Sequence, residues 1–436
     1  MKLVGIDIGT TTISATVLDT ELASLSEIKT VENGSFVETS NTWERIQDVS
    51  MIVARAEKLL VALLQQHDDV EAIGLTGQMH GILYTDQNGK CISPLYTWQD
   101  GRGDLPKENG ITLSEEVKKK TGREIASGYG LLTHLYNKRH EGVPETATCI
   151  CTIADYFGMV LTGRKKPLMH VSNAASLGFF DCATMCFDRK ELRMFGIEEN
   201  ILPELSGNFS VLGRYKGLPV CIALGDNQAG FLGSVGYQKN TLLVNMGTGG
   251  QISMMWNHYI QIPGIETRPF NNGTYLLVGA SLCGGRAYAI LEKFFRMYVA
   301  ASTGREKTQY DVMTKLAENI ETDSLQVSTL FQGTRQNPEK RGNIGNIGED
   351  NFTPGNLIYG VLRGMAEELF SMYQKMYDGT GSKVEMMIAS GNGLRKNPIL
   401  RNIFSTMFEA ELQPAAFMEE AASGAALAAS EVVSLL

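Results

Sequence analysis

The sequence predicts an α/β protein with two domains, which correspond to two related halves of the chain. Its 436 residues exceed the ~100 to 200 residues of a typical single domain. Apolar runs of strand length alternate with a segment of helical spacing in the first half. A hairpin with a glycine-threonine turn occurs near the N-terminus and again in the second half. We place the boundary so that the domains comprise residues 1–237 and 238–436.

The first of these hairpins opens the chain. Residues 3–8 form a short apolar run, the turn Gly9-Thr10-Thr11-Thr12 follows, and apolar and polar residues then alternate up to Val17, as in a β-hairpin. Apolar residues between Val49 and Leu64 recur at helical spacing, and residues 72–75 supply another buried strand. This order of elements predicts an α/β fold for the first half.

The second hairpin has the same form. An apolar strand at residues 242–246 runs into Gly247-Thr248-Gly249-Gly250, and a second strand begins at Gln251. The repetition suggests two related halves that face each other around a shared ligand; the alternative is chance similarity of two glycine-rich hairpins. Further on, the glycines and asparagines of residues 340–350 predict an exposed loop.

The composition narrows the class of protein. A hydrophobic fraction of 43% with 20% charged residues is typical of a globular enzyme with a sizeable core. The formal net charge of −9 disfavours nucleic acid and anionic membranes, which both require a basic face. A small-molecule ligand fits this charge better, and the chain could form a homodimer.

The cysteines and the N-terminus indicate a cellular compartment. The seven cysteines are odd in number and scattered, without a C-x-x-C pair of zinc-ligand spacing, so we interpret them as reduced thiols. Met1-Lys2 leads directly into the first strand without the features of a signal peptide, and no apolar run approaches the ~20 residues of a membrane span. We therefore expect a cytoplasmic protein.

The glycine-threonine turns are candidate phosphate sites. Such a turn offers backbone N–H groups and hydroxyls where a missing Cβ lets a phosphate approach, and two turns could clamp a polyphosphate. The alternative for each is a tight hairpin turn with no ligand. The sequence contains no P-loop motif. Asp7, just before the first turn, could hold Mg²⁺ through water; a solvated strand-end acid is the alternative, but its apolar neighbours indicate a partner.

A second acid, Asp226, follows an apolar run at residues 220–224 and opens a stretch of small residues. This placement predicts a carboxylate at a strand end, facing a helix N-terminus, where it could accept a proton from a sugar hydroxyl. The alternative is a helix N-cap with a structural role only.

Three further clusters have polar residues suited to ligands. Residues 76–81 and 97–102 combine aromatic and planar polar side chains, as carbohydrate sites do, although each could be an internally satisfied loop. An apolar strand at residues 386–390 leads into Gly391-Asn392-Gly393 and a helix from about Asn397, which predicts a nucleotide-binding corner.

Taken in this order, the segments resemble the FGGY family of carbohydrate kinases across nearly the whole chain. Residues 5–11 are similar to the family's first phosphate motif, residues 225–227 to its catalytic-base motif and residues 247–249 to its second phosphate motif. Residues 390–393 and the tail at residues 420–426 resemble its adenosine region.

This resemblance implies a fold of two ribonuclease-H-like domains of the actin/hexokinase/Hsp70 type, with ATP and a sugar in a cleft between them. It implies that Asp226 is the catalytic base and that Asp7 binds Mg²⁺. The implied sugar contacts are Gln78, Met79, His80, Trp98, Asp100, Arg102, Asp155 and Asn227. The implied nucleotide contacts are Thr10, Thr11, Thr12, Gly247, Thr248, Gly249, Gly391, Asn392, Gly393 and Asn397.

Several motifs also indicate a substrate. Residues 77–81 resemble the sugar loop shared by xylulokinases and sedoheptulokinases and argue against a glycerol kinase. Residues 97–102, 167–169 with 173–178, and 279–285 are more similar to sedoheptulokinases, whereas Gly225-Asp226-Asn227 has the xylulokinase form. The resemblance therefore favours phosphorylation of D-sedoheptulose to sedoheptulose 7-phosphate, with D-xylulose or another sugar as the alternative.

Two other classes share this type of fold. An actin- or Hsp70-like ATPase would need a partner-binding surface or a peptide domain, for which the chain has no spare length. A sugar sensor derived from a kinase is expected to have lost Asp226, which is present. ADP release with and without a panel of ketoses discriminates both from a sugar kinase.

Overall fold

The computed structural model describes residues 1–107, 110–318, 320, 325–334, 337 and 339–434. The chain forms two compact units. Unit 1 comprises residues 1–236, 268–275 and 417–436, and unit 2 comprises residues 237–267 and 276–416. The units thus differ from the predicted division after residue 237 in Tyr237, which lies in unit 2, and in segments 268–275 and 417–436, which lie in unit 1.

The sheet of unit 1 is mixed, with the order β13-β14-β5-β1-β2-β3 and with β15 paired to β5. Strand β1 (Lys2–Ile8) pairs antiparallel with β2 (Thr12–Asp19) and parallel with β5 (Val70–Gly77). This confirms the predicted opening hairpin and third strand. The other strands are β3 (Ser24–Glu32), β13 (Val211–Tyr215), β14 (Leu218–Cys221) and β15 (Leu224–Gly225).

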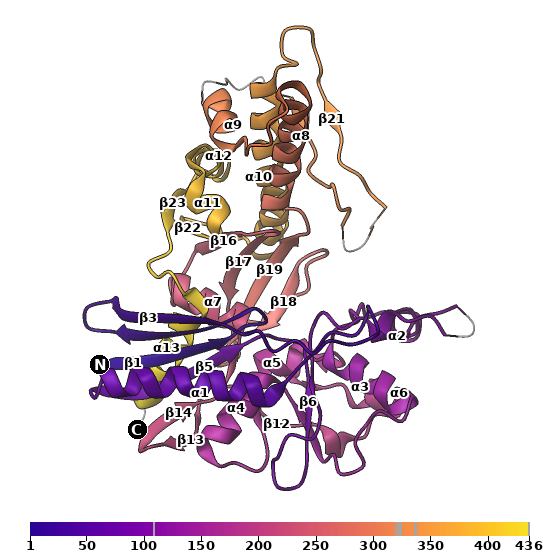
Figure 1. Cartoon of the computed structure of the whole chain (residues 1–436), viewed down its shortest axis with the longest axis vertical. Helices are drawn as coiled ribbons and strands as arrows, with labels where there is room; N and C mark the ends of the chain where they lie inside the picture. The colour runs from indigo at the N-terminus through magenta and orange to yellow at the C-terminus, as the bar shows by residue number, and fades with distance from the viewer. Residues whose placement is uncertain (108–109, 319, 321–324, 335–336, 338, 435–436) are drawn as a thin grey trace. The chain divides into compact units, whose positions relative to one another are not determined.

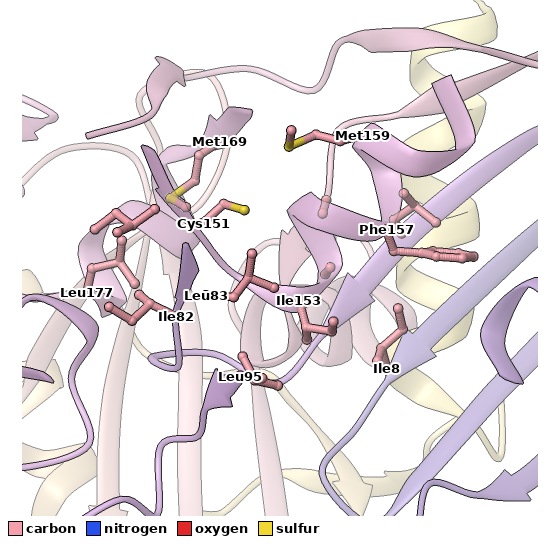
Figure 2. Close-up of a cluster of buried hydrophobic side chains, with 14 of the residues drawn as sticks. Ile8, Ile82, Leu83, Leu95, Cys151, Ile153, Phe157, Met159, Met169 and Leu177 are labelled. Atoms are coloured by element: carbon pink, nitrogen blue, oxygen red, sulfur yellow. The ribbon is translucent and has the colours of Figure 1, made fainter. Parts of the chain in front are cut away.

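Because side chains alternate along a strand, β1 has two different faces. Val4, Ile6 and Ile8 belong to the large core cluster, together with residues of α1 (Val49–Gln66) and α4 (Ile153–Thr162). Figure 2 shows Ile8 in this cluster with Ile153 and Phe157 of α4. Gly5 and Asp7 lie on the opposite face. The core face therefore anchors β1, and the opposite face carries Asp7.

Helix α13 (Glu420–Val433) covers that second face at very short range (Figure 1). A Cβ atom on Gly5 would lie 1.8 Å from the carbonyl oxygen of Ala422, and one on Gly74 would lie 1.8 Å from that of Ala425. Only glycine permits this approach. The alanines, serine and glycine at residues 422–426 are buried in this contact, so the tail that resembles the adenosine region packs within unit 1.

The central strands of unit 2 repeat the order of those in unit 1, whereas the outermost strands β18 and β13 lie at opposite edges. The sheet of unit 2 has the order β18-β19-β17-β16-β22-β23. Strand β16 (Thr241–Met246) pairs antiparallel with β17 (Gly250–Trp256) and parallel with β22 (Met386–Ser390), as β1 does with β2 and β5. The outer strands are β18 (Glu266–Pro269), β19 (Tyr275–Ser281) and β23 (Glu411–Pro414). The shared order indicates two related halves and disfavours chance similarity of two hairpins.

The remaining elements lie outside these two sheets (Figure 1). In unit 1 they are β4 (Ile46–Gln47), β6 (Leu83–Thr85), β7 (Leu95–Tyr96), α2 (Leu113–Thr121), α3 (Gly130–Arg139), β8 (Cys149–Cys151), β9 (Leu168–His170), α5 (Val171–Ser176), β10 (Phe180–Asp181), β11 (Cys186–Phe187), α6 (Arg189–Phe195), β12 (Glu204–Ser206) and α7 (Asp226–Val235). In unit 2 they are α8 (Gly285–Thr303), α9 (Tyr310–Ala317), β20 (Gln326–Val327), β21 (Ile344–Gly345), α10 (Pro354–Thr380), α11 (Asn392–Lys396) and α12 (Pro398–Phe408).

The predicted loop at residues 340–350 contains the short strand β21, which pairs with β20. Among the helices of the described residues, none combines the length and hydrophobicity that a membrane span requires.

Candidate active site

The turn between β1 and β2 is fixed by hydrogen bonds that other residues donate to its carbonyl oxygens. The Asn33 side chain donates to Gly9 O at 2.7 Å, the Gln47 side chain donates to Thr10 O at 2.9 Å, and the Asn33 backbone N–H donates to Thr11 O at 2.8 Å. In a trans peptide the N–H points opposite to the C=O. The N–H groups of Thr10 and Thr11 therefore point away from Asn33 and Gln47, which is the orientation that an anion-binding turn needs.

The turn between β16 and β17 in unit 2 is held in a similar way. The first N–H groups of α8, from Gly285 and Arg286, donate to Gly247 O at 2.9 Å and to Thr248 O at 3.0 Å. A Cβ atom on Gly249 would lie 2.8 Å from the carbonyl oxygen of Ser281, so a glycine is required there. Both turns thus have their carbonyl oxygens engaged by the protein.

Two other acidic residues, Asp226 and Glu419, act on Asp7. Burial, followed by the charges of Asp226 and Glu419, raises the pKa of Asp7 from its ordinary value of 3.8 to about 7. Burial also raises the pKa of Asp226, while the Asn227 side chain and the charge of Arg268 lower it. A carboxylate with a raised pKa is a stronger base near neutral pH, as proton abstraction requires.

Asp226 is the first residue of α7, and Gly225 is the N-cap without a side-chain capping bond. The alternative of a capping aspartate is therefore wrong. The Asn227 amide donates to Asp226 Oδ1 at 3.1 Å, which orients the carboxylate.

Asp7 is suited to a divalent cation. Its Oδ1 atom is buried without a hydrogen-bond partner, and its neighbours Asp226 and Glu419 add negative charge. A hard cation with oxygen ligands would relieve both conditions. No group of three or more His, Cys, Asp or Glu side chains with metal-binding geometry occurs among the described residues. The residues therefore fit Mg²⁺ held by one carboxylate together with water and phosphate oxygens.

The segment at residues 77–81 connects the predicted clusters of unit 1. Its Gln78 accepts a hydrogen bond from Thr10 Oγ1 at 3.2 Å. The Asn227 amide lies 3.9 Å from Met79 Sδ. The backbone N–H of His80 donates to Ser176 Oγ at 3.0 Å, and the His80 ring stacks on Tyr129 at 4.3 Å between centroids. One short segment thus links the turn between β1 and β2, the start of α7 and helix α5.

Residues 97–102 divide into exposed and buried members. Asp100 accepts from Arg102 Nε at 2.6 Å and from Arg102 Nη2 at 3.0 Å, and both side chains are buried. The Arg102 guanidinium also lies 4.3 Å from the centroid of the Tyr96 ring. Trp98 remains 48% exposed. The buried ion pair therefore supports the loop, and Trp98 is the member best placed to contact a ligand; direct sugar contacts of Asp100 and Arg102 stay predictions.

Asp155 occupies a capping position instead of an open surface. It completes the capping box of α4 with Thr152, whose hydroxyl donates to Asp155 Oδ2 at 2.7 Å. Its Oδ1 atom is buried without a partner. Burial raises the pKa of Asp155 from 3.8 to about 7, so the folded protein retains a proton that the unfolded chain releases.

This proton predicts a pH dependence of stability. Because the folded state binds it up to about pH 7, the free energy of unfolding should fall as the pH rises from about 4 to about 7 and level off above. We expect Asp155→Asn to remove this pH dependence. The change in the free energy of unfolding over this range amounts to a few kcal/mol, at ~1.4 kcal/mol per unit of pKa shift. Urea unfolding at several pH values measures this slope.

Asp48→Asn is the matched control. Asp48 caps α1, and hydrogen bonds from Ser50 and Met51 lower its pKa. Its stabilising effect is lost only as the pH falls below the ordinary pKa of 3.8, so this variant should leave the slope between about pH 4 and pH 7 unchanged. An unchanged slope for Asp155→Asn would contradict a protonated Asp155.

In unit 2, the predicted nucleotide corner adjoins the second turn. Gly391 has a φ of +82°, and a Cβ atom there would lie 2.6 Å from Met246 O, immediately before Gly247. Gly393 also lies against Met246. Asn397 is buried and caps α12, with its Oδ1 accepting from Leu400 N at 3.0 Å. Glycines 391 and 393 and the turn at 247–249 are thus brought together, whereas the Asn397 oxygen already has a protein partner.

Three residues near the site were not expected from the sequence. Asn33 and Gln47 hold the carbonyl groups of the first turn, and Glu419 contributes charge beside Asp7. They belong to no recognisable motif, and each lies far in sequence from the residue it affects. Their roles follow only from the chain path.

Comparisons with known proteins show the family of this chain. Residues 2–233 match the N-terminal domain of the FGGY family of carbohydrate kinases, and residues 242–431 match its C-terminal domain. The chain therefore belongs to the FGGY family. It is a carbohydrate kinase, a phosphotransferase with a mixed α/β fold of two domains.

The similarity to individual relatives extends over nearly the whole chain. A sedoheptulokinase of Mus musculus is 29% identical, over 97% of this chain and 96% of its own length. The crystal structure of a xylulose kinase from Lactobacillus acidophilus has a TM-score of 0.82 at 18% identity, and that of a gluconate kinase from the same species has 0.84 at 18%. Each match covers 100% of this chain and 90% of the solved chain. The structural matches at this identity establish the fold alone.

Proposed function

We propose that the chain transfers the γ-phosphoryl group of ATP to the terminal C7 hydroxyl of D-sedoheptulose, giving sedoheptulose 7-phosphate and ADP. The observation that carries this proposal is the similarity to a sedoheptulokinase over 97% of the chain, combined with the exposed Trp98 beside the phosphate turn. D-xylulose is the second candidate, since Gly225-Asp226-Asn227 has the xylulokinase form and xylulose kinases share the fold.

Asp226 is the base in this mechanism. Its carboxylate accepts the proton of the sugar hydroxyl while the hydroxyl oxygen forms a bond to the γ-phosphorus and the bond to the β-phosphate oxygen breaks. The Asn227 amide fixes the carboxylate through the bond to Oδ1. Because the transition state is loose, position and charge matter more than the strength of the base.

The other groups hold the phosphates and the sugar. The N–H groups of Thr10 and Thr11 bind phosphoryl oxygens, and the turn at residues 247–249 offers a second set of donors. Asp7 would hold Mg²⁺, which when bound neutralises charge on the phosphoryl oxygens. Gln78, His80 and Asn227 supply polar partners to sugar hydroxyls, and the Trp98 ring supplies an apolar face.

We expect D-sedoheptulose to have a higher kcat/KM than D-xylulose, by ~10- to 100-fold, and glycerol to be essentially inert. The heptulose carries two more hydroxylated carbons than the pentulose. Contacts of the protein with these hydroxyl groups raise kcat/KM if they are made in the transition state. Coupled ADP-release kinetics over a panel of ketoses, gluconate and glycerol measures this preference. Equal or better efficiency on D-xylulose would overturn the choice of sugar and leave the kinase mechanism intact.

A further inference from the structure

Gln47 lies at the end of strand β4, outside every motif of the sequence, and is fully buried. Both ends of its side-chain amide are engaged. Nε2 donates to the carbonyl oxygen of Thr10 at 2.9 Å, and Oε1 accepts from Gln78 Nε2 at 2.9 Å. The residue therefore joins the phosphate turn to the segment at residues 77–81.

These bonds close a ring of three residues. The Thr10 hydroxyl donates to Gln78 Oε1 at 3.2 Å, Gln78 donates to Gln47, and Gln47 donates back to Thr10 O. The indole N–H of Trp98 enters the ring from outside and donates to Thr10 Oγ1 at 2.9 Å.

The direction of every bond in the ring is set by the Thr10 carbonyl. A carbonyl oxygen can only accept, so Gln47 turns its NH₂ group to Thr10 O and its oxygen to the NH₂ group of Gln78. The oxygen of Gln78 then accepts from the Thr10 hydroxyl, whose lone pairs are left to accept from the indole N–H of Trp98. Trp98 on the exposed loop and the Thr10 carbonyl of the turn are thus joined by one chain of hydrogen bonds.

We propose that Gln47 is a positioning residue that couples the Trp98 loop to the phosphate turn through this ring. Without the ring, the Thr10 carbonyl is released and the N–H of Thr11, in the same peptide, loses its fixed direction. The inference rests on the proposed binding of phosphate at Thr10, and the test therefore measures nucleotide binding separately from sugar turnover.

The test uses the full chain and titration calorimetry with AMP-PNP and Mg²⁺. Gln47→Met keeps the size of the side chain and removes its amide, and we expect the Kd for AMP-PNP to rise by about 5- to 30-fold, as loss of one or two buried hydrogen bonds implies. The matched control is Gln309→Met in unit 2, which also removes a buried glutamine and is expected to leave this Kd unchanged.

Trp98→Phe provides the second arm, because it keeps an aromatic ring and removes only the N–H donor. We expect it to raise the AMP-PNP Kd by about 3- to 10-fold. This effect on nucleotide binding would come from a residue of the loop that we assign to the sugar. The double variant should show less than the product of the two single effects, since both act through Thr10.

Three results would overturn the coupling: an effect of Gln47→Met no larger than that of Gln309→Met, an unchanged Kd in Trp98→Phe, or multiplicative single effects. A chain that phosphorylates no ketose but shows the expected pattern in Kd would instead contradict the proposed function.

Discussion

Asp226→Asn should reduce kcat by ~10²- to 10⁴-fold, the usual cost of losing a general base. The substitution is nearly isosteric and keeps an oxygen able to accept from Asn227, so the fold and nucleotide binding should persist. Only the capacity to take up the hydroxyl proton is lost. Steady-state kinetics with the preferred ketose, together with the AMP-PNP Kd, separates these effects.

Asp86→Asn is the control for this change. Asp86 accepts backbone N–H bonds from Asn88 and Lys90 in a surface turn, where asparagine is equally suitable. Its kcat should match that of the unmodified chain. Near-normal turnover of Asp226→Asn would remove Asp226 from the mechanism.

Two alanine substitutions three residues apart on α7 should have opposite effects on stability. A Cβ atom on Gly233 would lie 1.9 Å from Glu420 O and 2.8 Å from Gly424 N of α13, whereas a Cβ atom on Gly230 has nothing within 4 Å. Gly233→Ala should therefore cost ~4 kcal/mol or more, or prevent folding. Gly230→Ala should be neutral or stabilise the helix by up to ~1 kcal/mol.

Denaturant unfolding of the two variants measures this difference, and their similar helix propensities make each the control of the other. The outcome matters for function because α13 follows directly after Glu419, whose charge acts on Asp7. Similar stabilities of the two variants would show that α13 does not pack against α7 so closely that only glycine fits at position 233.

Much of the fold was predictable because its signals are local. Apolar periodicity and turn residues depend on near neighbours, and the hairpin of β1 and β2, helix α1 and strand β22 appear where the sequence indicates. The resemblance between the two hairpins likewise indicated the related strand orders of the two sheets. The placement of α13 in unit 1 was not predictable, because a run of small residues does not reveal its packing partner.

The candidate site shows the same division. The sequence by itself determined the family, the fold class and the segments whose side chains are suited to phosphate or sugar, since motif order and residue chemistry lie in the chain. Only the tertiary structure decided which of these groups already have protein partners. Asp100 and Arg102 pair with each other, Asp155 caps a helix, and Gln47 holds the turn between β1 and β2. The path of the folded chain brings together hydrogen-bond partners that are far apart in sequence. The local sequence around each residue does not indicate which partner it will meet.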